Sequence, residues 1–290
     1  CRPAYRRPTH CEGFSVVDRF PILRVRDATL AFSDRTLWRN LNLDLHPGEF
    51  LAVLGSNGTG KTSLIKTILG QQKLTAGSVE LLGKPVRAGS RDIGYIPQQK
   101  SLGQGAPVRA RDLVGFGIDG HRWGVPRASR ARRDRIDEVL ESVGAGEYGD
   151  SPLSSLSGGE QQRVRVAQAI AGRPRVLLCD EPLLSLDLAQ QRSVSELIDD
   201  KRRELNTGVV FVTHDVNPIL GMVDRVLYLA GGQFRIGTPD EVLRSTVLSY
   251  LYNTPVEVIR SRGRIIVIGA PDGYGAHELS VHHDHDEGGA

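Results

Sequence analysis

Short apolar runs, separated by longer amphipathic stretches, organise the chain from about residue 22 onward. The clearest runs are FLAVLG (50–55), RVLLCD (175–180), GVVFVTH (208–214) and DRVLYLA (224–230), each bounded by Gly, Pro or charged residues. Short, continuously apolar runs are typical of strands buried on both faces of a sheet. Strands that alternate with amphipathic stretches predict an α/β domain with a largely parallel sheet.

Two further patterns predict a helix and a hairpin. In PRASRARRDRIDEVLESVG (126–144) the apolar residues recur at helical spacing and lie on one face: Ile136, Val139, Leu140 and Val143. Acidic residues interleave with its arginines, which favours a solvated helix face over a nucleic-acid surface. The stretch VEVIRSRGRIIVIG, after residue 254, predicts a β-hairpin that turns near residues 261–263.

Composition narrows the class of protein. The 290 residues are 24% charged and 39% hydrophobic, which is ordinary for a soluble globular protein, and a net charge of +3 is too small to indicate nucleic-acid binding. No apolar run reaches the ~18 residues that a membrane span needs, and the N-terminal stretch lacks the apolar core of a signal peptide. Cys1, Cys11 and Cys179 show neither a disulfide framework nor zinc spacing, which fits a reducing cytosol.

A glycine-rich loop follows the first predicted strand and precedes the predicted helix TSLIKTILG. The loop has the Walker A pattern GxxxxGK[ST] in the strand-to-helix context that this pattern requires. Its glycines let backbone N–H groups point at phosphate oxygens, Lys61 supplies a cation for the β- and γ-phosphates, and Thr62 supplies a hydroxyl for Mg²⁺. The expected nucleotide-binding residues here are Gly55, Ser56, Asn57, Gly58, Thr59, Gly60, Lys61, Thr62 and Ser63.

Polar residues end two of the other predicted strands. Asp180 and Glu181 follow RVLLC, and His214 ends VVFVTH. Because ligands bind at the carboxyl edge of a parallel sheet, Asp180 is expected to reach Mg²⁺ and Glu181 to polarise the attacking water. Alone, the acidic pair could cap the next helix and the His could be structural; downstream of a phosphate loop both favour catalysis.

A second small-residue loop opens another predicted helix. LSSLSGGEQQRVRVAQAIAG contains Ser157, Gly158, Gly159 and Glu160 directly before an amphipathic run, so it predicts a second anion site at a helix N-terminus. A generic phosphate-loop enzyme needs only one such site.

This stretch resembles the signature of the ABC ATPase family, and the other family motifs follow in order. Phe32 in LAFSDRTL resembles the aromatic that stacks on adenine, where many members have Tyr. IGYIPQQ resembles the Q-loop with Gln98, SLD the D-loop with Asp187, and His214 the switch histidine. The resemblance covers roughly residues 22–252. It implies a phosphate-loop NTPase fold with a RecA-like core, an N-terminal antiparallel β-subdomain and an inserted helical subdomain.

The resemblance also implies how the site works. Two such domains close head-to-tail around two ATP molecules, so the chain is expected to act as a homodimer in which Ser157 and Gly159 touch the γ-phosphate bound by the partner. Glu181, His214 and Gln98 are the implied catalytic residues, and Thr62, Gln98 and Asp180 the implied Mg²⁺ ligands. Cys179 replaces a common aliphatic residue and Leu183–Leu184 replace smaller residues; neither change alters a catalytic atom.

These patterns divide the chain into four parts. Residues 1–20 are expected to be a loose N-terminal arm and 21–253 the ATPase domain, with its helical subdomain at roughly 100–158. A C-terminal β-hairpin is expected at 254–270, followed by a flexible His-rich tail at 271–290.

Three classes of function remain open. The first is the energy-coupling ATPase subunit of a bacterial ABC importer, lying on the cytoplasmic face of the membrane and working with integral-membrane permease subunits and, indirectly, an extracytoplasmic substrate-binding protein. The second is a soluble ABC ATPase that acts on DNA or ribosomes, and the third a regulatory or metal-storing protein. The long coiled-coil insertion, zinc fingers or paired cassettes that usually mark the second class are absent from the sequence, and we expect no nucleic-acid partner. The third class rests on the tail alone.

The cargo is expected to be zinc or manganese. GTPDEVLRSTVLSYLYNTPVEVIRSRGRIIVIG resembles the end of ATPase subunits from zinc and manganese uptake systems. An importer for iron-siderophore or another nutrient is the main alternative, ahead of a drug or lipid exporter.

The tail HELSVHHDHDEGGA holds four histidines beside carboxylates: His277, His282, His283 and His285. Such a cluster could bind zinc in the cytosol and report on metal supply, or be a solvated end. Zinc calorimetry before and after deletion of residues 277–290 distinguishes the two.

Overall fold

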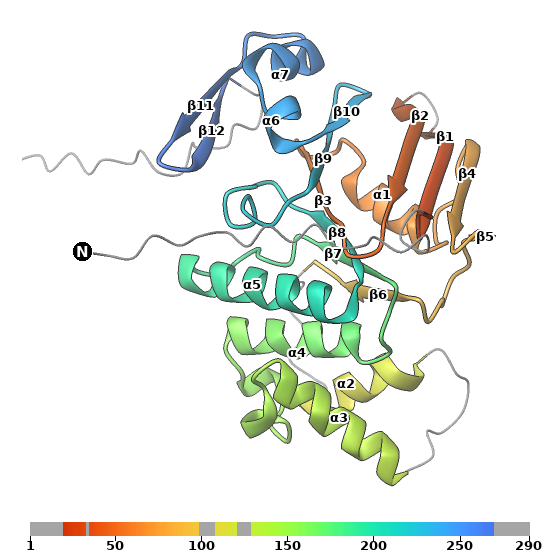
Figure 1. Cartoon of the computed structure of the whole chain (residues 1–290), viewed down its shortest axis with the longest axis vertical. Coiled ribbons are helices and arrows are strands. Elements are labelled where there is room, and N and C mark those ends of the chain that lie inside the picture. Colours follow the sequence, from red (N-terminus) through yellow and green to blue (C-terminus); the bar gives the residue numbers. More distant parts are fainter. Residues whose placement is uncertain (1–19, 33–34, 99–107, 121–128, 270–290) are drawn as a thin grey trace, which may run out of the picture.

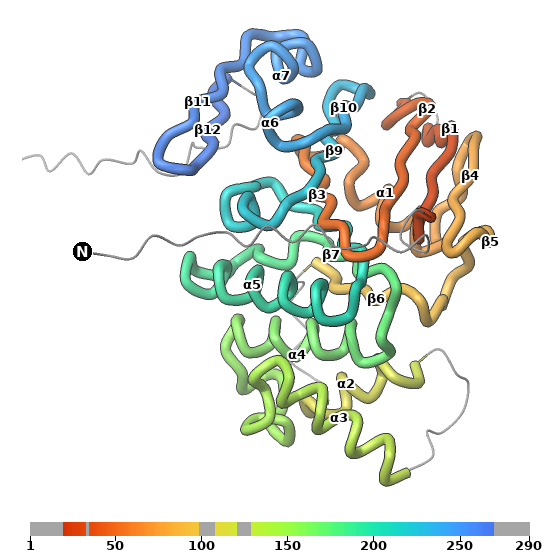
Figure 2. The backbone as a smooth tube through the Cα atoms, viewed as in Figure 1, coloured from red at the N-terminus to blue at the C-terminus, as the bar shows by residue number. Residues whose placement is uncertain are grey.

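A parallel sheet at the centre of the molecule separates a smaller antiparallel sheet from a group of helices (Figure 1). The structure is a computed structural model, and it describes residues 20–32, 35–98, 108–120 and 129–269. Figure 2 follows the backbone, which passes from the antiparallel sheet to the central sheet, returns to the antiparallel sheet, and crosses the central sheet again before it enters the helices. Within the described residues no helix is both long and apolar enough to cross a bilayer.

The central sheet is six-stranded in the described part of the chain, with the order β10-β9-β3-β8-β7-β6. All its neighbouring strands pair in parallel except β10, which is antiparallel to β9. Every residue of β3, β7 and β8 is buried, which explains their continuous apolar sequences. The four predicted strands are confirmed to within two residues at each end. The strands are β3 (Phe50–Gly55), β6 (Ile93–Ile96), β7 (Val176–Asp180), β8 (Gly208–Val212), β9 (Arg225–Ala230) and β10 (Gln233–Gly237).

The antiparallel sheet has the order β2-β1-β4-β5 and lies beside helix α1 (Figure 1). Alternate residues of β1 are buried, as expected for a sheet with one apolar face. Its buried side chains share one apolar cluster with α1 and one face of the central sheet. The elements are β1 (Leu23–Phe32), β2 (Arg35–Leu45), α1 (Lys61–Ile68), β4 (Ala76–Leu81) and β5 (Lys84–Pro85).

The helices on the other side of the central sheet include the inserted helical subdomain. The helices α2, α3 and α4 pack against one another, and α4 also contacts α5. The predicted helix is confirmed as α3: Ser129 accepts a hydrogen bond from Arg132 N as its N-cap, and Ile136, Val139, Leu140 and Val143 are buried. The elements are α2 (Ala110–Asp119), α3 (Arg130–Ser142), α4 (Gly158–Ile170) and α5 (Leu188–Leu205), with 3-10 turns at Gly146–Tyr148 and Leu153–Ser155.

Three of the four arginines of α3, namely Arg130, Arg132 and Arg135, form ion pairs with carboxylates. Arg132 forms an ion pair of 2.6 Å with Asp119 of α2, and Arg135 one of 2.9 Å with Glu138 in the next turn. Most of the positive charge of α3 is therefore paired within the helical subdomain.

The C-terminal elements lie at one end of the central sheet, above the loop that follows β8 (Figure 1). The phenol oxygens of Tyr252 in α7 and Tyr228 in β9 are hydrogen-bonded at 3.0 Å, and burial raises the pKa of Tyr228. The elements are α6 (Pro239–Val242), α7 (Ser245–Tyr252), β11 (Glu257–Ser261) and β12 (Arg264–Ile268). β11 and β12 pair antiparallel and turn at residues 262–263; this pair is called the hairpin below.

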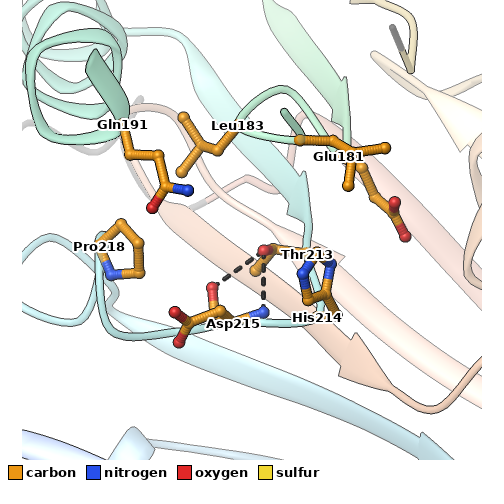
Figure 3. A pocket seen from close by; sticks show the side chains of 8 residues that line it. Glu181, Leu183, Gln191, Thr213, His214, Asp215 and Pro218 are labelled. Atoms are coloured by element: carbon orange, nitrogen blue, oxygen red, sulfur yellow. Dashed lines mark hydrogen bonds between the residues drawn. The ribbon is translucent and has the colours of Figure 1, made fainter. Parts of the chain in front are cut away.

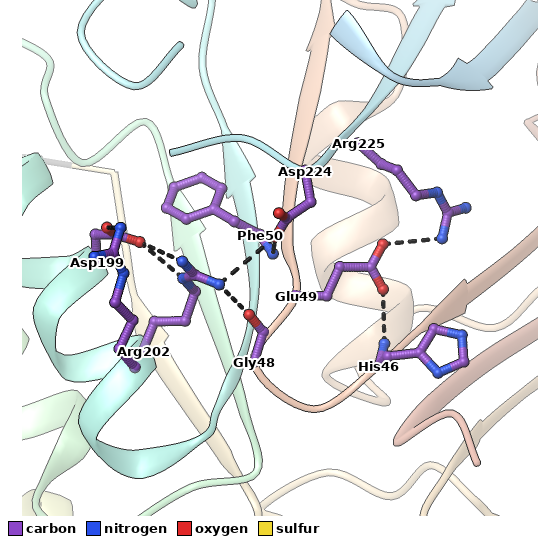
Figure 4. A network of polar contacts seen from close by, with 9 residues as sticks. His46, Gly48, Glu49, Phe50, Asp199, Arg202, Asp224 and Arg225 are labelled. Carbon is purple, nitrogen blue, oxygen red and sulfur yellow. Dashed lines mark hydrogen bonds and ion pairs between the residues drawn. The ribbon is translucent and has the colours of Figure 1, made fainter. Parts of the chain in front are cut away.

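A polar network fixes the amino ends of β3 and β9 (Figure 4). The phosphate loop lies at the opposite end of β3, before α1. Arg202 of α5 donates to the carbonyl of Gly48 and to Asp199, and its guanidinium lies 5.9 Å from the centre of the Phe50 ring. Asp224 accepts the N–H of Phe50 at 2.8 Å. The network joins α5 to the start of β3 through a residue pair 154 positions apart.

Replacing Arg202 by Met is expected to lower the free energy of unfolding by about 2 kcal/mol, because the Asp199 carboxylate, only 6% exposed, loses a charged partner. Arg203→Met is the matched control: Arg203 also pairs with Asp199, but its side chain is 64% exposed, so the expected loss is under about 1 kcal/mol. Urea titration measures both, and equal losses in the two variants would contradict the assignment.

Candidate active site

The phosphate loop, residues 55–62, leaves the carboxyl end of β3 and enters α1 at Lys61. Gly55 has a φ of +142°, and a Cβ there would lie 2.1 Å from the carbonyl oxygen of Leu229. Gly60 has a φ of +100°, and its Cβ would lie 2.8 Å from Trp38 Nε1. Both positions therefore require glycine for conformation and for space.

Lys61 lies inside the curl of this loop. Its Nζ donates to the carbonyl oxygens of Gly55 and Ser56, at 2.6 and 2.9 Å, and its side chain is buried. Thr59 Oγ1 donates to the same Ser56 carbonyl at 2.9 Å. The ammonium group is thus held at the positive end of α1, where a phosphate would lie.

Arg35 is a contact of the phosphate loop that the sequence motifs did not indicate. Its Nη2 donates to the carbonyl of Gly58 at 2.9 Å from the start of β2. Arg35 lies in the stretch LAFSDRTL, where the resemblance assigns a role only to Phe32, and the packing of the antiparallel sheet beside α1 brings it to the loop.

Thr62 and Asp180 meet although they are 118 positions apart. Thr62 Oγ1 lies 3.4 Å from Asp180 Oδ1. Thr62 is at the start of α1, after the loop that follows β3, and Asp180 is the last residue of β7, so the two meet at the carboxyl edge of the central sheet. Burial, and then repulsion from Glu181, raise the pKa of Asp180. The Thr62 hydroxyl and the Asp180 carboxylate offer oxygen ligands, which Mg²⁺ prefers. The positive charge of a bound Mg²⁺ would favour the ionised form of Asp180.

Glu181 and Gln98 also lie together. Gln98 Nε2 donates to Glu181 Oε2 at 3.0 Å, which joins the second residue after β6 to the first residue after β7. Glu181 has a φ of +47°, and its N–H donates to the carbonyl of Val212 at 2.9 Å. The strand pairing thus continues one residue beyond β7 and fixes the backbone of Glu181 at the sheet edge.

His214 lies at the same edge, just beyond β8, and is exposed. Its side chain and that of Glu181 line one shallow pocket together with residues of the segment after Glu181, of α5 and of the loop after His214 (Figure 3). The pocket brings the predicted base and the predicted switch histidine to one surface.

The signature loop, residues 156–160, begins α4. Ser157 Oγ accepts from Glu160 N at 3.3 Å, and the Glu160 carboxylate accepts from Ser157 N at 2.8 Å, so the two residues form a capping box. The hydrogen bond from the Ser157 N–H lowers the pKa of Glu160. Ser157 is exposed while Gly159 is buried beside Gln190, where a Cβ would lie 3.2 Å from Gln190 Cδ. Asp187 caps α5 by accepting from Gln190 N at 2.8 Å.

Phe32, the tail histidines and the cysteines are also singled out in the sequence. Phe32 is 46% exposed at the end of β1, and a side chain that stacks on adenine must be exposed in this way. His277, His282, His283 and His285 fall outside the described residues, as do Cys1 and Cys11, and Cys179 is buried beside Asp180. Among the residues that the structure describes, no group of three or more His, Cys, Asp or Glu side chains could hold a metal ion.

Comparison with known proteins identifies the family. A family model described as "ABC transporter" matches residues 38–184, which span the phosphate loop, the signature loop and Glu181. An ABC transporter solved in an inward-facing conformation has a chain with a TM-score of 0.73 and 28% identity, covering 85% of this chain and 96% of that one.

Three relatives illustrate the range of similar proteins. A manganese transport system ATP-binding protein of Halalkalibacterium halodurans is 28% identical, over 86% of this chain and 98% of its own length. A zinc import ATP-binding protein of Halorhodospira halophila is 30% identical, over 91% and 90%. An iron(3+)-hydroxamate import ATP-binding protein of Bacillus subtilis is 31% identical, over 79% and 87%. By motif, fold and relatives the chain belongs to the ABC transporter family, and it is an ATP-hydrolysing member of that family.

Proposed function

We propose that the chain is the energy-coupling ATPase subunit of an importer for divalent metal, zinc or manganese. The observation that supports ATP hydrolysis best is the meeting of Lys61, Asp180 and Glu181, with Gln98 and His214, at one edge of the central sheet. The domain division given above, with the ATPase domain at residues 21–253, is part of the proposal.

The phosphate loop would bind the β- and γ-phosphates of ATP. Lys61 supplies the cation and the start of α1 the backbone N–H groups, while exposed Phe32 supplies a face for adenine. Thr62, Asp180 and Gln98 would hold Mg²⁺, which neutralises developing charge on the phosphates when bound.

Glu181 would orient and deprotonate the attacking water. Gln98 donates to its Oε2, which leaves its second carboxylate oxygen to accept a proton from water. His214, on the same pocket, would donate a hydrogen bond to the γ-phosphate.

The signature loop would act on the partner's nucleotide in a head-to-tail homodimer. The Ser157 hydroxyl accepts from Glu160 N, and a hydroxyl that accepts one hydrogen bond can still donate its own proton. That O–H and the start of α4 form a donor site for an anion at an exposed surface. ATP between the two loops would hold the dimer closed, and hydrolysis would release it.

The partners proposed for this dimer are integral-membrane permease subunits at the cytoplasmic face of the membrane, and indirectly an extracytoplasmic substrate-binding protein. The proposal of metal as cargo rests on the manganese and zinc relatives and on the C-terminal stretch 237–269. The iron-hydroxamate relative keeps a second importer class as the alternative. The zinc role of the tail remains a prediction.

Uptake of radiolabelled zinc, manganese and ferric hydroxamate, with and without the gene, tests the cargo. Zinc or manganese uptake is expected to fall several-fold on deletion and to return with the wild-type gene but not with Glu181→Gln. Selective loss of ferric hydroxamate uptake would favour an iron-hydroxamate importer. Unchanged uptake of all three would contradict the proposal that the chain serves an importer for any of these cargoes.

A further inference from the structure

The hairpin is packed against the loop that follows His214. Ile265 and Val267 of β12 are 3% exposed and belong to the same apolar cluster as Val216 and Ile219, which flank Asn217. The C-terminal end of the described chain therefore touches the segment next to a proposed catalytic residue.

Asn217 joins the two segments by a pair of hydrogen bonds. Its Nδ2 donates to the carbonyl of Ile265 at 3.0 Å, and the N–H of Ile265 donates to its Oδ1 at 2.8 Å. Both backbone groups of Ile265 thus face Asn217 and not β11, where Arg260 stands opposite. In an antiparallel pair such a residue has its N–H and C=O on the free edge of its strand, so the side-chain amide of Asn217 takes the place of a neighbouring strand.

The other contacts of Asn217 run back toward His214. Its N–H and its Nδ2 donate to Asp215 Oδ1 at 2.8 and 2.9 Å. Asp215 is bonded in turn to Thr213: its N–H donates to Thr213 Oγ1 at 3.1 Å, and that hydroxyl donates to the Asp215 carbonyl at 2.9 Å (Figure 3). The residues on both sides of His214 are therefore fixed, and both Nδ2 protons of Asn217 are used.

We propose that Asn217 is a positioning residue for ATP hydrolysis: it fastens the His214 loop, residues 213–217, to β12, so that the hairpin sets where His214 stands in the pocket it shares with Glu181. The inference rests on the proposed role of His214. It assigns the hairpin to the control of turnover, because any partner or ligand that moves β12 moves the loop through this contact.

Asn217→Ala tests the inference in the full chain. Turnover (kcat) is expected to fall on the order of tenfold, because a misplaced catalytic group slows reaction steeply. The KM for ATP is expected to stay close to that of the wild type, because Asn217 bonds Asp215 and Ile265, whereas Lys61 and the phosphate loop would bind the phosphates.

Ser249→Ala is the matched control. Ser249 Oγ in α7 also makes two hydrogen bonds to one backbone residue near the hairpin, donating to the Val256 carbonyl at 3.1 Å and accepting its N–H at 2.9 Å. These two bonds hold the same C-terminal region, and both go to Val256 instead of the His214 loop. Similar thermal destabilisation is expected in both variants, with kcat reduced only by Asn217→Ala.

Hydrogen exchange provides a readout independent of activity. The amides of Ile265 and Asp215 are expected to exchange faster in Asn217→Ala than in Ser249→Ala. Normal kcat in Asn217→Ala, or equal loss of kcat in both variants, would overturn the inference. The variant His214→Ala separates the proposed role of His214 from the proposed role of Asn217. Full activity in His214→Ala would overturn both roles. Normal turnover in Asn217→Ala, together with an inactive His214→Ala, would overturn only the role of Asn217.

Discussion

Replacement of Glu181 by Gln is expected to reduce ATP turnover by about 10²- to 10³-fold while leaving ATP binding intact. The amide cannot accept the proton of the attacking water, but its carbonyl oxygen can still accept the hydrogen bond from Gln98 Nε2. The φ of +47° and the backbone bond to Val212 belong to the main chain and are unaffected by the change. The site should therefore keep its shape and lose only its base.

The same variant is expected to accumulate as a dimer in ATP, because the closed pair would not be released by hydrolysis. Single-turnover ATPase assays and size-exclusion chromatography with and without ATP measure the two effects. Glu196→Gln on α5, whose carboxylate is exposed and pairs with Arg192, is the control and should hydrolyse ATP at the wild-type rate. Undiminished hydrolysis by Glu181→Gln would refute the assignment of the base.

The sequence predicts those parts of the fold whose cause is local. β3, β7 and β8 are buried on both faces, so their sequences must be apolar throughout, and the pattern alone predicts them. Lys61 follows a loop in which Gly55 and Gly60 have positive φ angles, so the backbone conformation itself requires the glycines of the motif. β8 ends at Val212, two residues earlier than predicted, because Thr213 turns back to bond Asp215.

The contacts that the sequence does not predict join segments distant along the chain. Arg35 reaches Gly58, Arg202 reaches Gly48, and Asn217 reaches Ile265, and in each case the acceptor is a backbone carbonyl. A carbonyl is present at every residue, so no residue type marks the partner in the sequence. Only the packing of the antiparallel sheet, α5 and the hairpin brings these pairs together.

The position of these contacts relates stability to function. The Arg202 network lies at the amino ends of the strands, and the proposed catalytic residues lie at their carboxyl ends. Substitution in the first group is therefore expected to change unfolding, and substitution in the second to change nucleotide binding or turnover. Asn217 differs from both groups because it joins the carboxyl edge to the hairpin.

Lys61→Ala is expected to weaken ATP binding about 100-fold, corresponding to about 3 kcal/mol for the lost charge-assisted hydrogen bonds to phosphate. The Lys61 ammonium lies within bonding distance of the Gly55 and Ser56 carbonyls, so it is already inside the loop that would surround the phosphates. The neighbouring glycines keep their backbone conformation, because their φ values do not depend on this side chain.

Lys66→Ala separates the local role of Lys61 from net charge. Lys66 is on the same helix and is exposed. Its replacement by Ala removes the same charge as Lys61→Ala, but it should leave the Kd for ATP within about twofold of the wild type. Calorimetric titration with ATP and magnesium gives both constants, and thermal unfolding checks that each variant is folded. Equal weakening by the two substitutions would mean that general electrostatic attraction holds the nucleotide, whereas a loss confined to Lys61→Ala would follow from its place inside the curl of the loop.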